Sequence, residues 1–308
     1  MPHQPTSDLH CPRIVLRTDG PELSRVVAGM WRMTAWNMSV DERVAFIERC
    51  IDMGVTTFDH ANIYGDYGVV SLFGEALRAA PLLRERIELV SKCGIKLISH
   101  KHPQHAIQHY DTTGEHIVAS AEESLRRLHT DHLDLLLIHR PDPLMDFDDI
   151  ADAFLRLKAA GKVRHFGVSN FTRHQFESLN RRVALATNQV EFSPLATAPM
   201  FDETFDGLQD LRIAPMVWSP LGGGRLFDPS DARATALRDV IQDVATRMAR
   251  PFASVVFAWI MALPSRPVPL TGSGRIEAIA DAVQGATFQL ERNDWFRILR
   301  AARGHEVA

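Results

Sequence analysis

Short apolar runs alternate along the chain with longer segments in which apolar residues recur every three or four positions. Runs of the first kind are typical of buried strands, and segments of the second kind are typical of amphipathic helices. Eight strand-length runs follow one another from Val26 onward, and a helical segment comes after each. The expected strands are residues 26–28, 55–58, 87–92, 133–138, 163–168, 187–190, 214–218 and 268–271.

Local start and stop signals support the expected helices. Ser39 and Glu42 form a capping-box pattern ahead of an apolar repeat that ends at Gly54, and Thr172 with Gln175 opens a shorter helix. Further helices are expected over residues 68–80, 113–128, 147–160, 201–211, between 234 and 262, and from about 275 onward.

The even alternation of strands and helices predicts the fold class. No linker or low-complexity break interrupts it, which argues for one parallel sheet, and eight repeats argue for closure into a single (β/α)8 TIM barrel. Ahead of the barrel, the turn signal Asp19-Gly20-Pro21 separates apolar runs at residues 13–16 and 24–28 and predicts an N-terminal β-hairpin plug. We therefore expect a mobile polar tail over residues 1–12 and one barrel domain over residues 13–308.

The main alternative is a doubly wound sheet, which would need a dinucleotide-binding glycine motif after an early strand. Gly272-Ser273-Gly274 follows the last expected strand but lacks the third glycine, and too little chain remains after it for further strands. The glycines at 222–224 also lack the required spacing. Any nucleotide must therefore bind in another way.

The composition excludes several kinds of partner. With 308 residues and 45% hydrophobic content the chain can bury a large core, and 34 basic against 38 acidic residues leave a net charge of only −4. This balance predicts no nucleic-acid or membrane partner, and no segment has the apolar length of a membrane span or a signal sequence. Cys11, Cys50 and Cys93 lack the spacing of a disulfide framework or a zinc site. We expect a cytoplasmic monomer or weak oligomer that acts on small molecules.

Four side chains that carry chemistry follow successive expected strands. Asp59 and Tyr64 follow the second strand, Lys92 ends the third and His139 follows the fourth, so a barrel would bring them to one mouth. A lysine beside a phenol stabilises the phenolate and lowers a pKa that starts near ~10. Tyr64 is then a proton donor for a carbonyl reduction in which a nicotinamide supplies hydride. Taken singly, the residues have plainer interpretations: a capping aspartate, a packed tyrosine, a solvated lysine and a structural histidine.

The motifs around these residues closely resemble the aldo-keto reductase family, in a bacterial oxidoreductase branch, over nearly the whole chain. The matching segments are Thr57-Phe58-Asp59 with Tyr64-Gly65, Val90-Ser91-Lys92, Leu133-Asp134-Leu135-Leu136-Leu137-Ile138-His139, Gly167-Val168-Ser169-Asn170-Phe171 and Asn188-Gln189-Val190-Glu191. The resemblance implies that Tyr64 is the general acid and that Lys92 lowers its pKa. It also implies that Asp59 pairs with Lys92 and that His139 orients the substrate carbonyl.

The same resemblance implies that an extended NADP(H) binds across the barrel mouth. Ser169, Asn170 and Gln189 match the positions that hold the nicotinamide carboxamide, and Trp218 stands where an aromatic ring stacks on it. Ser219-Pro220-Leu221-Gly222-Gly223-Gly224-Arg225 is similar to the loop that folds over the pyrophosphate, although a flexible surface loop is its plainer interpretation. The remaining implied cofactor residues are Gly29, Met30, Trp31, Asp59 and, for the adenosine 2′-phosphate at a helix start, Thr271-Gly272-Ser273-Gly274-Arg275.

The sequence departs from the family pattern at two places. Ala278 and Ala282 replace an arginine and an asparagine at the adenine end, so NADP(H) is expected but NAD(H) stays possible. Arg140 replaces an aromatic residue after His139. As a hypothesis, Arg140 joins Trp31, Tyr64 and His139 in the substrate pocket, with Trp36 nearby, and favours polar or anionic carbonyl compounds. The alternative is an ion pair with an acid of a neighbouring loop.

The sequence carries two weaker signals and leaves two rival functions open. His100, His102, His105 and His109 crowd one loop, but no acid or cysteine joins them, so a solvated loop is favoured over a metal site. Cys93 is expected to be a small buried filler.

A metal-dependent barrel hydrolase could use Asp59, His60 and His139, but the first strand supplies no pair of histidines. A cofactor-binding regulatory protein with little turnover stays open beside the favoured function, NADPH-dependent reduction of aldehydes or ketones to alcohols.

Overall fold

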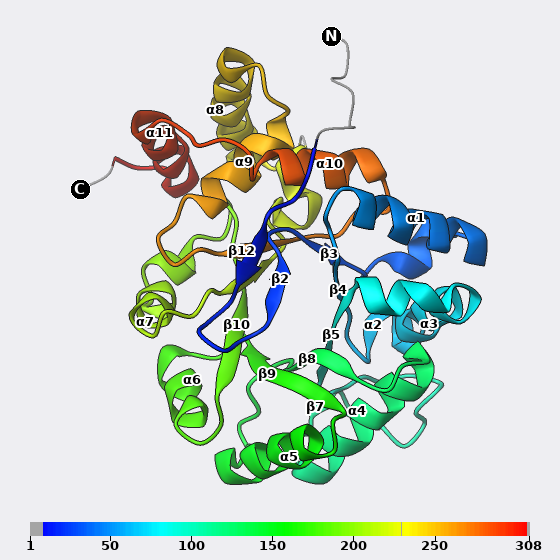
Figure 1. Cartoon of the computed structure of the whole chain (residues 1–308). Helices are drawn as coiled ribbons and strands as arrows, with labels where there is room; N and C mark the ends of the chain where they lie inside the picture. The colour runs from blue at the N-terminus through cyan, green and yellow to red at the C-terminus, as the bar shows by residue number, and fades with distance from the viewer. Residues whose placement is uncertain (1–8, 229, 307–308) are drawn as a thin grey trace.

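Eight parallel strands close into a barrel in the computed structural model, which describes residues 9–228 and 230–306 (Figure 1). The barrel strands are β3 (Val27–Gly29), β4 (Thr57–Asp59), β5 (Glu88–Cys93), β8 (Leu133–Ile138), β9 (Val163–Ser169), β10 (Leu185–Glu191), β11 (Met216–Trp218) and β12 (Val268–Thr271). Chain order and barrel order agree from β3 to β12, and β12 pairs with β3 to close the ring.

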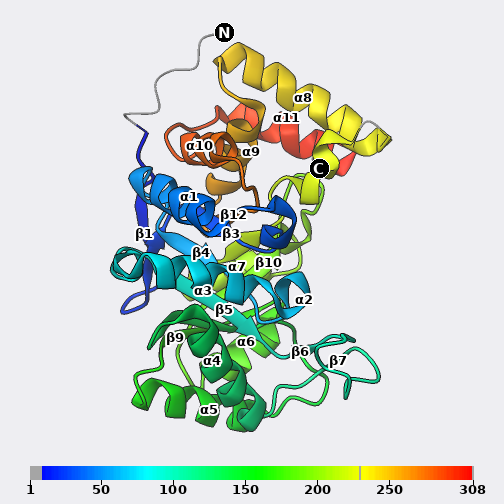
Figure 2. The same cartoon turned by 90° about the vertical axis from the view of Figure 1, so that its right-hand side faces the viewer.

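Helices surround the barrel and confirm the predicted (β/α)8 fold. They are α1 (Val40–Asp52), α3 (Val69–Ala79), α4 (Gly114–Leu128), α5 (Phe147–Ala159), α6 (Arg173–Asn180), α7 (Thr204–Asp210), α8 (Ala232–Met248), α9 (Phe252–Met261), α10 (Ile276–Gln284) and α11 (Arg292–Arg303). Figure 2 shows α8 and α11 together at one end of the molecule. They share an apolar cluster with α9 that includes Ile241, Trp259 and Ile298.

The predicted capping boxes are both formed. The Ser39 hydroxyl accepts from the Glu42 amide at 3.3 Å, and the Glu42 carboxylate accepts from the Ser39 amide at 2.8 Å. Thr172 and Gln175 make the same pair of bonds at the start of α6. α1 stops before Gly54, which has a φ of 75°. These helix starts and this helix end therefore follow from residues a few positions apart.

The N-terminal hairpin is present, but one predicted boundary was wrong. β1 (Arg13–Val15) pairs antiparallel with β2 (Glu22–Ser24), and the run at 24–28 is divided between β2 and β3. Ile14, Leu16 and Leu23 pack with the apolar residues that fill the barrel interior. In Figure 1 the hairpin lies across the middle of the barrel, so it plugs one end as predicted.

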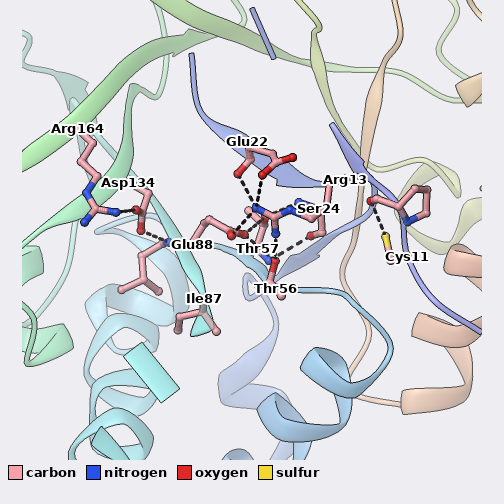
Figure 3. A network of polar contacts seen from close by, with 12 residues as sticks. Cys11, Arg13, Glu22, Ser24, Thr56, Thr57, Ile87, Glu88, Asp134 and Arg164 are labelled. Carbon is pink, nitrogen blue, oxygen red and sulfur yellow. Dashed lines mark hydrogen bonds and ion pairs between the residues drawn. The ribbon is translucent and has the colours of Figure 1, made fainter. Parts of the chain in front are cut away.

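A polar network ties this hairpin to the starts of several barrel strands (Figure 3). Arg13 donates to the Thr56 hydroxyl at 2.5 Å and to the Glu88 carboxylate at 2.8 Å. On the neighbouring strand, Asp134 accepts from Arg164 at 2.9 Å. These residues lie at the amino ends of the strands, the end of such a barrel that usually serves stability.

Other differences from the predicted elements are local. The helix expected over 201–211 begins only at Thr204, α11 was not separated from the expected closing helix, and a small hairpin of β6 (Ile95–Lys96) and β7 (His109–Tyr110) was not expected. A mobile tail was expected over residues 1–12, and residues 1–8 of it lie outside the described residues. Residues 9–12 are ordered, because Cys11 is buried and its amide donates to the Met53 carbonyl at 2.7 Å.

Candidate active site

Lys92 and Asp59 form a buried ion pair at the carboxyl ends of neighbouring strands β5 and β4. The Lys92 ammonium has three acceptors: the Asp59 carboxylate, the His60 carbonyl at 3.0 Å and the Tyr64 hydroxyl at 3.1 Å. Burial by itself lowers the pKa of Lys92, but the charge and hydrogen bonds of Asp59 and Tyr64 outweigh it and raise that pKa. Lys92 therefore stays charged although its side chain is fully buried.

Tyr64 opens the short helix α2 (Tyr64–Tyr67), and the backbone then turns sharply away. Gly65, Asp66 and Tyr67 all have φ between 52° and 60°. Residues other than glycine adopt this left-handed backbone conformation only at a cost in free energy. Burial raises the pKa of Tyr64 above its ordinary value, and the nearby Lys92 lowers it by less. Lys92 thus acts on the pKa of Tyr64 in the expected direction, but the expected net lowering is wrong because burial outweighs it, and Tyr64 keeps its proton at neutral pH.

His139 joins the same group from the end of β8. Its amide donates to the Cys93 carbonyl at 2.8 Å, and its ring meets the Tyr64 ring edge-on with centres 5.8 Å apart. Burial, followed by the charges of Lys92 and Arg140, holds the pKa of His139 well below its ordinary value. The imidazole is therefore neutral, and its buried Nδ1 has no partner among the described residues. The fold thus brings together the four residues predicted to carry the chemistry.

The residues predicted to hold the nicotinamide form one network with this group. Gln189 donates to the Asp59 carboxylate at 2.9 Å, and the Ser169 hydroxyl donates to the Gln189 carbonyl at 2.7 Å. The Asn170 side chain donates to the Ser169 hydroxyl at 2.7 Å and accepts from the Trp218 indole at 3.2 Å. The four predicted residues come from β9, β10, β11 and the turn after β9, so only barrel closure makes them neighbours of Asp59.

The predicted pyrophosphate loop adopts the backbone that its glycines allow. Gly222, Gly223 and Gly224 have φ of 62°, 67° and 103°, within the short helix η5 (Gly222–Phe227). A side chain at Gly224 would meet nothing within 4 Å, so the backbone there is open to an approaching ligand. Arg225, also predicted for this loop, pairs instead with Asp231 at 2.7 Å.

The predicted 2′-phosphate segment lies next to the first barrel strand. Thr271 ends β12, and a side chain at Gly29 would lie 3.5 Å from the Thr271 carbonyl oxygen. The Ser273 hydroxyl accepts from the Arg275 amide at 3.2 Å, and Arg275 is exposed directly before α10. Helix α10 begins without a side-chain cap, so its first amides are available to an anion.

The loop after β3 differs from its prediction in two ways. Met30 is fully buried, and its amide and carbonyl are already bonded to Asp59 and Met33, which leaves it little capacity to contact a ligand. Arg32, which was not predicted, donates to the Gly223 carbonyl at 2.8 Å and so joins this loop to the pyrophosphate loop. Arg32 could have been predicted from the sequence because it directly follows Trp31, which was predicted for the cofactor site.

Three tryptophans and Arg140 lie around the mouth, in an arrangement different from the one expected. The Arg140 guanidinium lies over Trp218, 5.6 Å from the ring centre. Trp31 is 56% exposed, and Trp36 packs so closely on Gly274 that a side chain at that glycine would lie 2.7 Å from the indole. Trp36 therefore packs against the segment predicted to bind the 2′-phosphate.

The histidine-rich loop is held by contacts among its own rings. His102 and His105 are stacked with centres 5.0 Å apart, and His105 meets His109 edge-on at 5.7 Å. In the described part of the chain, no group of three His, Cys, Asp or Glu side chains is placed to hold a metal ion. Cys93 is buried, and burial raises the pKa of its thiol to about 12, as expected of a filler rather than a reactive cysteine.

Comparison with known proteins identifies the class to which this barrel belongs. The model of the Aldo/keto reductase family matches residues 25–303, and the chain belongs to that family. Oxidoreductase YdhF of Escherichia coli strain K12 is 54% identical over 96% of this chain and 99% of its own length. A 6-dehydroglucose reductase of Agrobacterium fabrum is 42% identical over 96% of this chain and 99% of its own.

Solved structures agree on the fold. The thermostable aldo-keto reductase Tm1743, crystallised with the inhibitor epalrestat, superposes with a TM-score of 0.78 at 23% identity, covering 94% of this chain and 99% of that one. Aldo/keto reductases are oxidoreductases that act on carbonyl groups of small molecules and generally use NAD(P)H, so the predicted reaction class is confirmed. Across the described residues, every helix is too short or too polar to cross a membrane.

Proposed function

We propose that this protein reduces aldehyde or ketone carbonyls to alcohols, with hydride from NADPH and a proton from the Tyr64 hydroxyl. One observation carries the proposal: the buried Lys92 ammonium bonds at once to the Asp59 carboxylate and, at 3.1 Å, to the Tyr64 hydroxyl. An ion pair that served stability alone would need no tyrosine. A phenol that gives up a proton needs a cation close by, because the cation stabilises the phenolate that forms.

The charge states of the three polar side chains suit this role. Tyr64 holds its proton before the reaction because burial raises its pKa. When the proton moves to the substrate oxygen, the charged Lys92 stabilises the phenolate more than it stabilised the phenol, which lowers the barrier. His139 is neutral, so its N–H group donates a hydrogen bond that orients the carbonyl without competing as an acid.

The residues present fit a nicotinamide dinucleotide, which supplies the hydride when bound. Ser169, Asn170 and Gln189 would hold its carboxamide, and Trp218 would stack on its ring. The open backbone at the glycines of the 219–225 loop and the uncapped start of α10 suit the phosphates. The exposed Arg275 fork beside α10 favours NADP(H) over NAD(H), because the 2′-phosphate adds an anion that this fork can bind.

The substrate is proposed to be a small aldehyde or ketone that binds beside Trp31, Tyr64 and His139. The Agrobacterium relative is named for the reduction of 6-dehydroglucose, an oxygen-rich aldehyde. We therefore expect polyhydroxylated aldehydes to be better substrates than alkyl aldehydes. We also expect the enzyme to be a cytoplasmic monomer or weak oligomer.

Substitution of the proton donor tests the proposal. Tyr64→Phe removes the hydroxyl and keeps the ring, so kcat for glyceraldehyde with NADPH should fall about 100- to 10,000-fold. The Kd for NADPH, measured by quenching of tryptophan fluorescence, should change less than about twofold because the cofactor contacts are retained. Tyr110→Phe, at an exposed tyrosine of β7, is the matched control and should keep full activity.

Two results would contradict the proposal. Full turnover by Tyr64→Phe would remove the assigned proton donor. A wild-type protein that binds NADPH but reduces no aldehyde or ketone would instead favour the regulatory protein considered from the sequence.

A further inference from the structure

Arg140 is a cation at the barrel mouth that has no acidic partner. In residues 9–228 and 230–306, no carboxylate lies within 4.0 Å of its guanidinium, and its N–H groups make no hydrogen bond. Other arginines of the barrel and its loops are paired: Arg225 in η5 with Asp231 at 2.7 Å and Arg164 in β9 with Asp134 at 2.9 Å. The ion pair that the sequence left open for Arg140 is therefore not formed by the described residues.

The contact that Arg140 does make leaves its donors free. Its guanidinium lies over the Trp218 ring at 5.6 Å. A cation–π contact uses the charge of the guanidinium, so its five N–H groups stay available as hydrogen-bond donors. Arg140 is also partly exposed, so a ligand can reach those groups.

The guanidinium lies close to the reacting groups. Arg140 directly follows His139, and its charge contributes to lowering the pKa of both His139 and Tyr64. A substrate whose carbonyl oxygen lies between Tyr64 and His139 therefore has a free, charged donor group beside it. Trp218, over which the guanidinium lies, is also the residue proposed to stack on the nicotinamide ring.

We infer that Arg140 selects the substrate, by binding an oxygen-bearing group on the carbon skeleton next to the carbonyl. The inference rests on the proposed reduction at Tyr64 and names its substrate class. A phosphate or carboxylate should bind best because its hydrogen bonds to a guanidinium are charge-assisted and bidentate, a hydroxyl should bind less well, and an alkyl group should not bind. The preferred substrates are thus small aldehydes or ketones that carry an anionic oxygen group.

Three aldehydes with the same three-carbon chain test this ranking: propanal, glyceraldehyde and glyceraldehyde 3-phosphate. For the wild-type protein, kcat/KM should rise along the series and end about 10- to 100-fold higher for the phosphate than for propanal. Arg140→Ala should remove most of that ratio while propanal, the internal reference, changes by less than about threefold. Arg140→Lys should keep part of the phosphate preference, because it keeps the charge, and lose the hydroxyl preference with the fork.

Binding measurements separate this inference from the proposed reaction. Calorimetric titration with glycerol 3-phosphate, in the presence of NADP⁺, should show a Kd at least about tenfold weaker for Arg140→Ala than for the wild type, whether or not turnover is detected. Arg303→Ala is the matched control, since Arg303 also lies over an exposed ring, that of Phe201, at 4.7 Å, and it should behave as the wild type.

Two outcomes would overturn the role of Arg140 and leave carbonyl reduction intact. One is equal kcat/KM for all three aldehydes in the wild type together with unchanged glycerol 3-phosphate binding in Arg140→Ala. The other is a loss in Arg140→Ala that is proportional for all three substrates and accompanied by weaker NADPH binding, which would show that Arg140 only braces Trp218.

Discussion

Lys92 and His60 are both buried beside Asp59, yet only Lys92 is charged. Three acceptors surround the Lys92 ammonium, and their effect outweighs burial. His60 is fully buried, bonds through Nδ1 to the Val90 carbonyl at 3.3 Å and packs edge-on against Phe73. Burial therefore dominates and lowers the pKa of His60 to about 3. The partners that each side chain meets, and not burial alone, decide its charge.

This difference predicts how stability depends on pH. An unfolded histidine titrates near ~6.5, so between that pH and about 3 the unfolded chain binds a proton at His60 that the folded chain does not. The free energy of unfolding should therefore fall as pH falls, by about 2 kcal/mol between pH 7 and pH 5 from this residue. Urea unfolding at both pH values measures it.

The matched variants isolate the contribution of His60. His60→Asn should lower stability at both pH values, because packing is lost, but should reduce the pH-dependent difference by about 2 kcal/mol. The exposed His174→Asn should leave that difference unchanged. The same pH dependence in His60→Asn and in the wild type would show that His60 is not the group responsible.

Helix α3 shows how an element can depend on a distant neighbour. Its apolar repeat predicted a helix, although Gly74 in its middle disfavours one by about 1 kcal/mol relative to alanine. The structure explains the glycine: a side chain there would overlap the carbonyl oxygen of Arg127 in α4. Gly74 therefore allows α3 and α4 to pack more closely than any other residue would.

Gly74→Ala should accordingly destabilise the protein, although alanine favours helices. The two helices must separate, so we expect the free energy of unfolding to fall by about 1 to 3 kcal/mol in chemical denaturation. Gly207→Ala in α7 is the control, because the nearest atom to its new side chain is the flexible Arg173 side chain at 2.9 Å. A Gly74→Ala protein more stable than the wild type would disprove the close approach.

The two ends of the barrel serve different purposes in the whole molecule. Asp59, Lys92 and His139 lie at the carboxyl ends of the strands, whereas the network of Arg13, Glu88 and Asp134 lies at the amino ends (Figure 3). The two sets lie at opposite ends of the barrel, so substitutions in one set need not disturb the other. Stability should therefore be changeable at one end without a change in chemistry at the other.

Asp134→Ala tests this separation. Asp134 is buried and accepts from the Leu89 amide, Arg84 and Arg164, each at 2.9 Å. Its loss leaves the mostly buried Arg84 without its acidic partner, so the free energy of unfolding should fall by about 3 to 5 kcal/mol. Below the unfolding transition, kcat/KM should stay within about twofold of the wild type. A large loss of activity in the folded variant would mean that the two ends are coupled; the exposed Asp152→Ala is the control.

Residues close together in sequence determined the order of strands and helices. The capping pairs at Ser39 and Thr172 act over three positions, and the apolar repeats act over single turns, so both can be read without knowing what packs where. Eight such repeats were enough to predict the barrel. The motifs around Asp59, Tyr64, Lys92 and His139 were then enough to predict which side chains meet at its mouth.

Tertiary structure alone decided the charge states and partners of those side chains. Lys92 and Asp59 are 33 positions apart, and Gln189 reaches Asp59 from 130 positions away. Whether Tyr64 keeps its proton or Arg140 has a partner depends on desolvation and on groups from many elements at once, and no local pattern records these. The sequence by itself therefore determined the barrel and the composition of its mouth, and the closing of the barrel decided what those residues are able to do there.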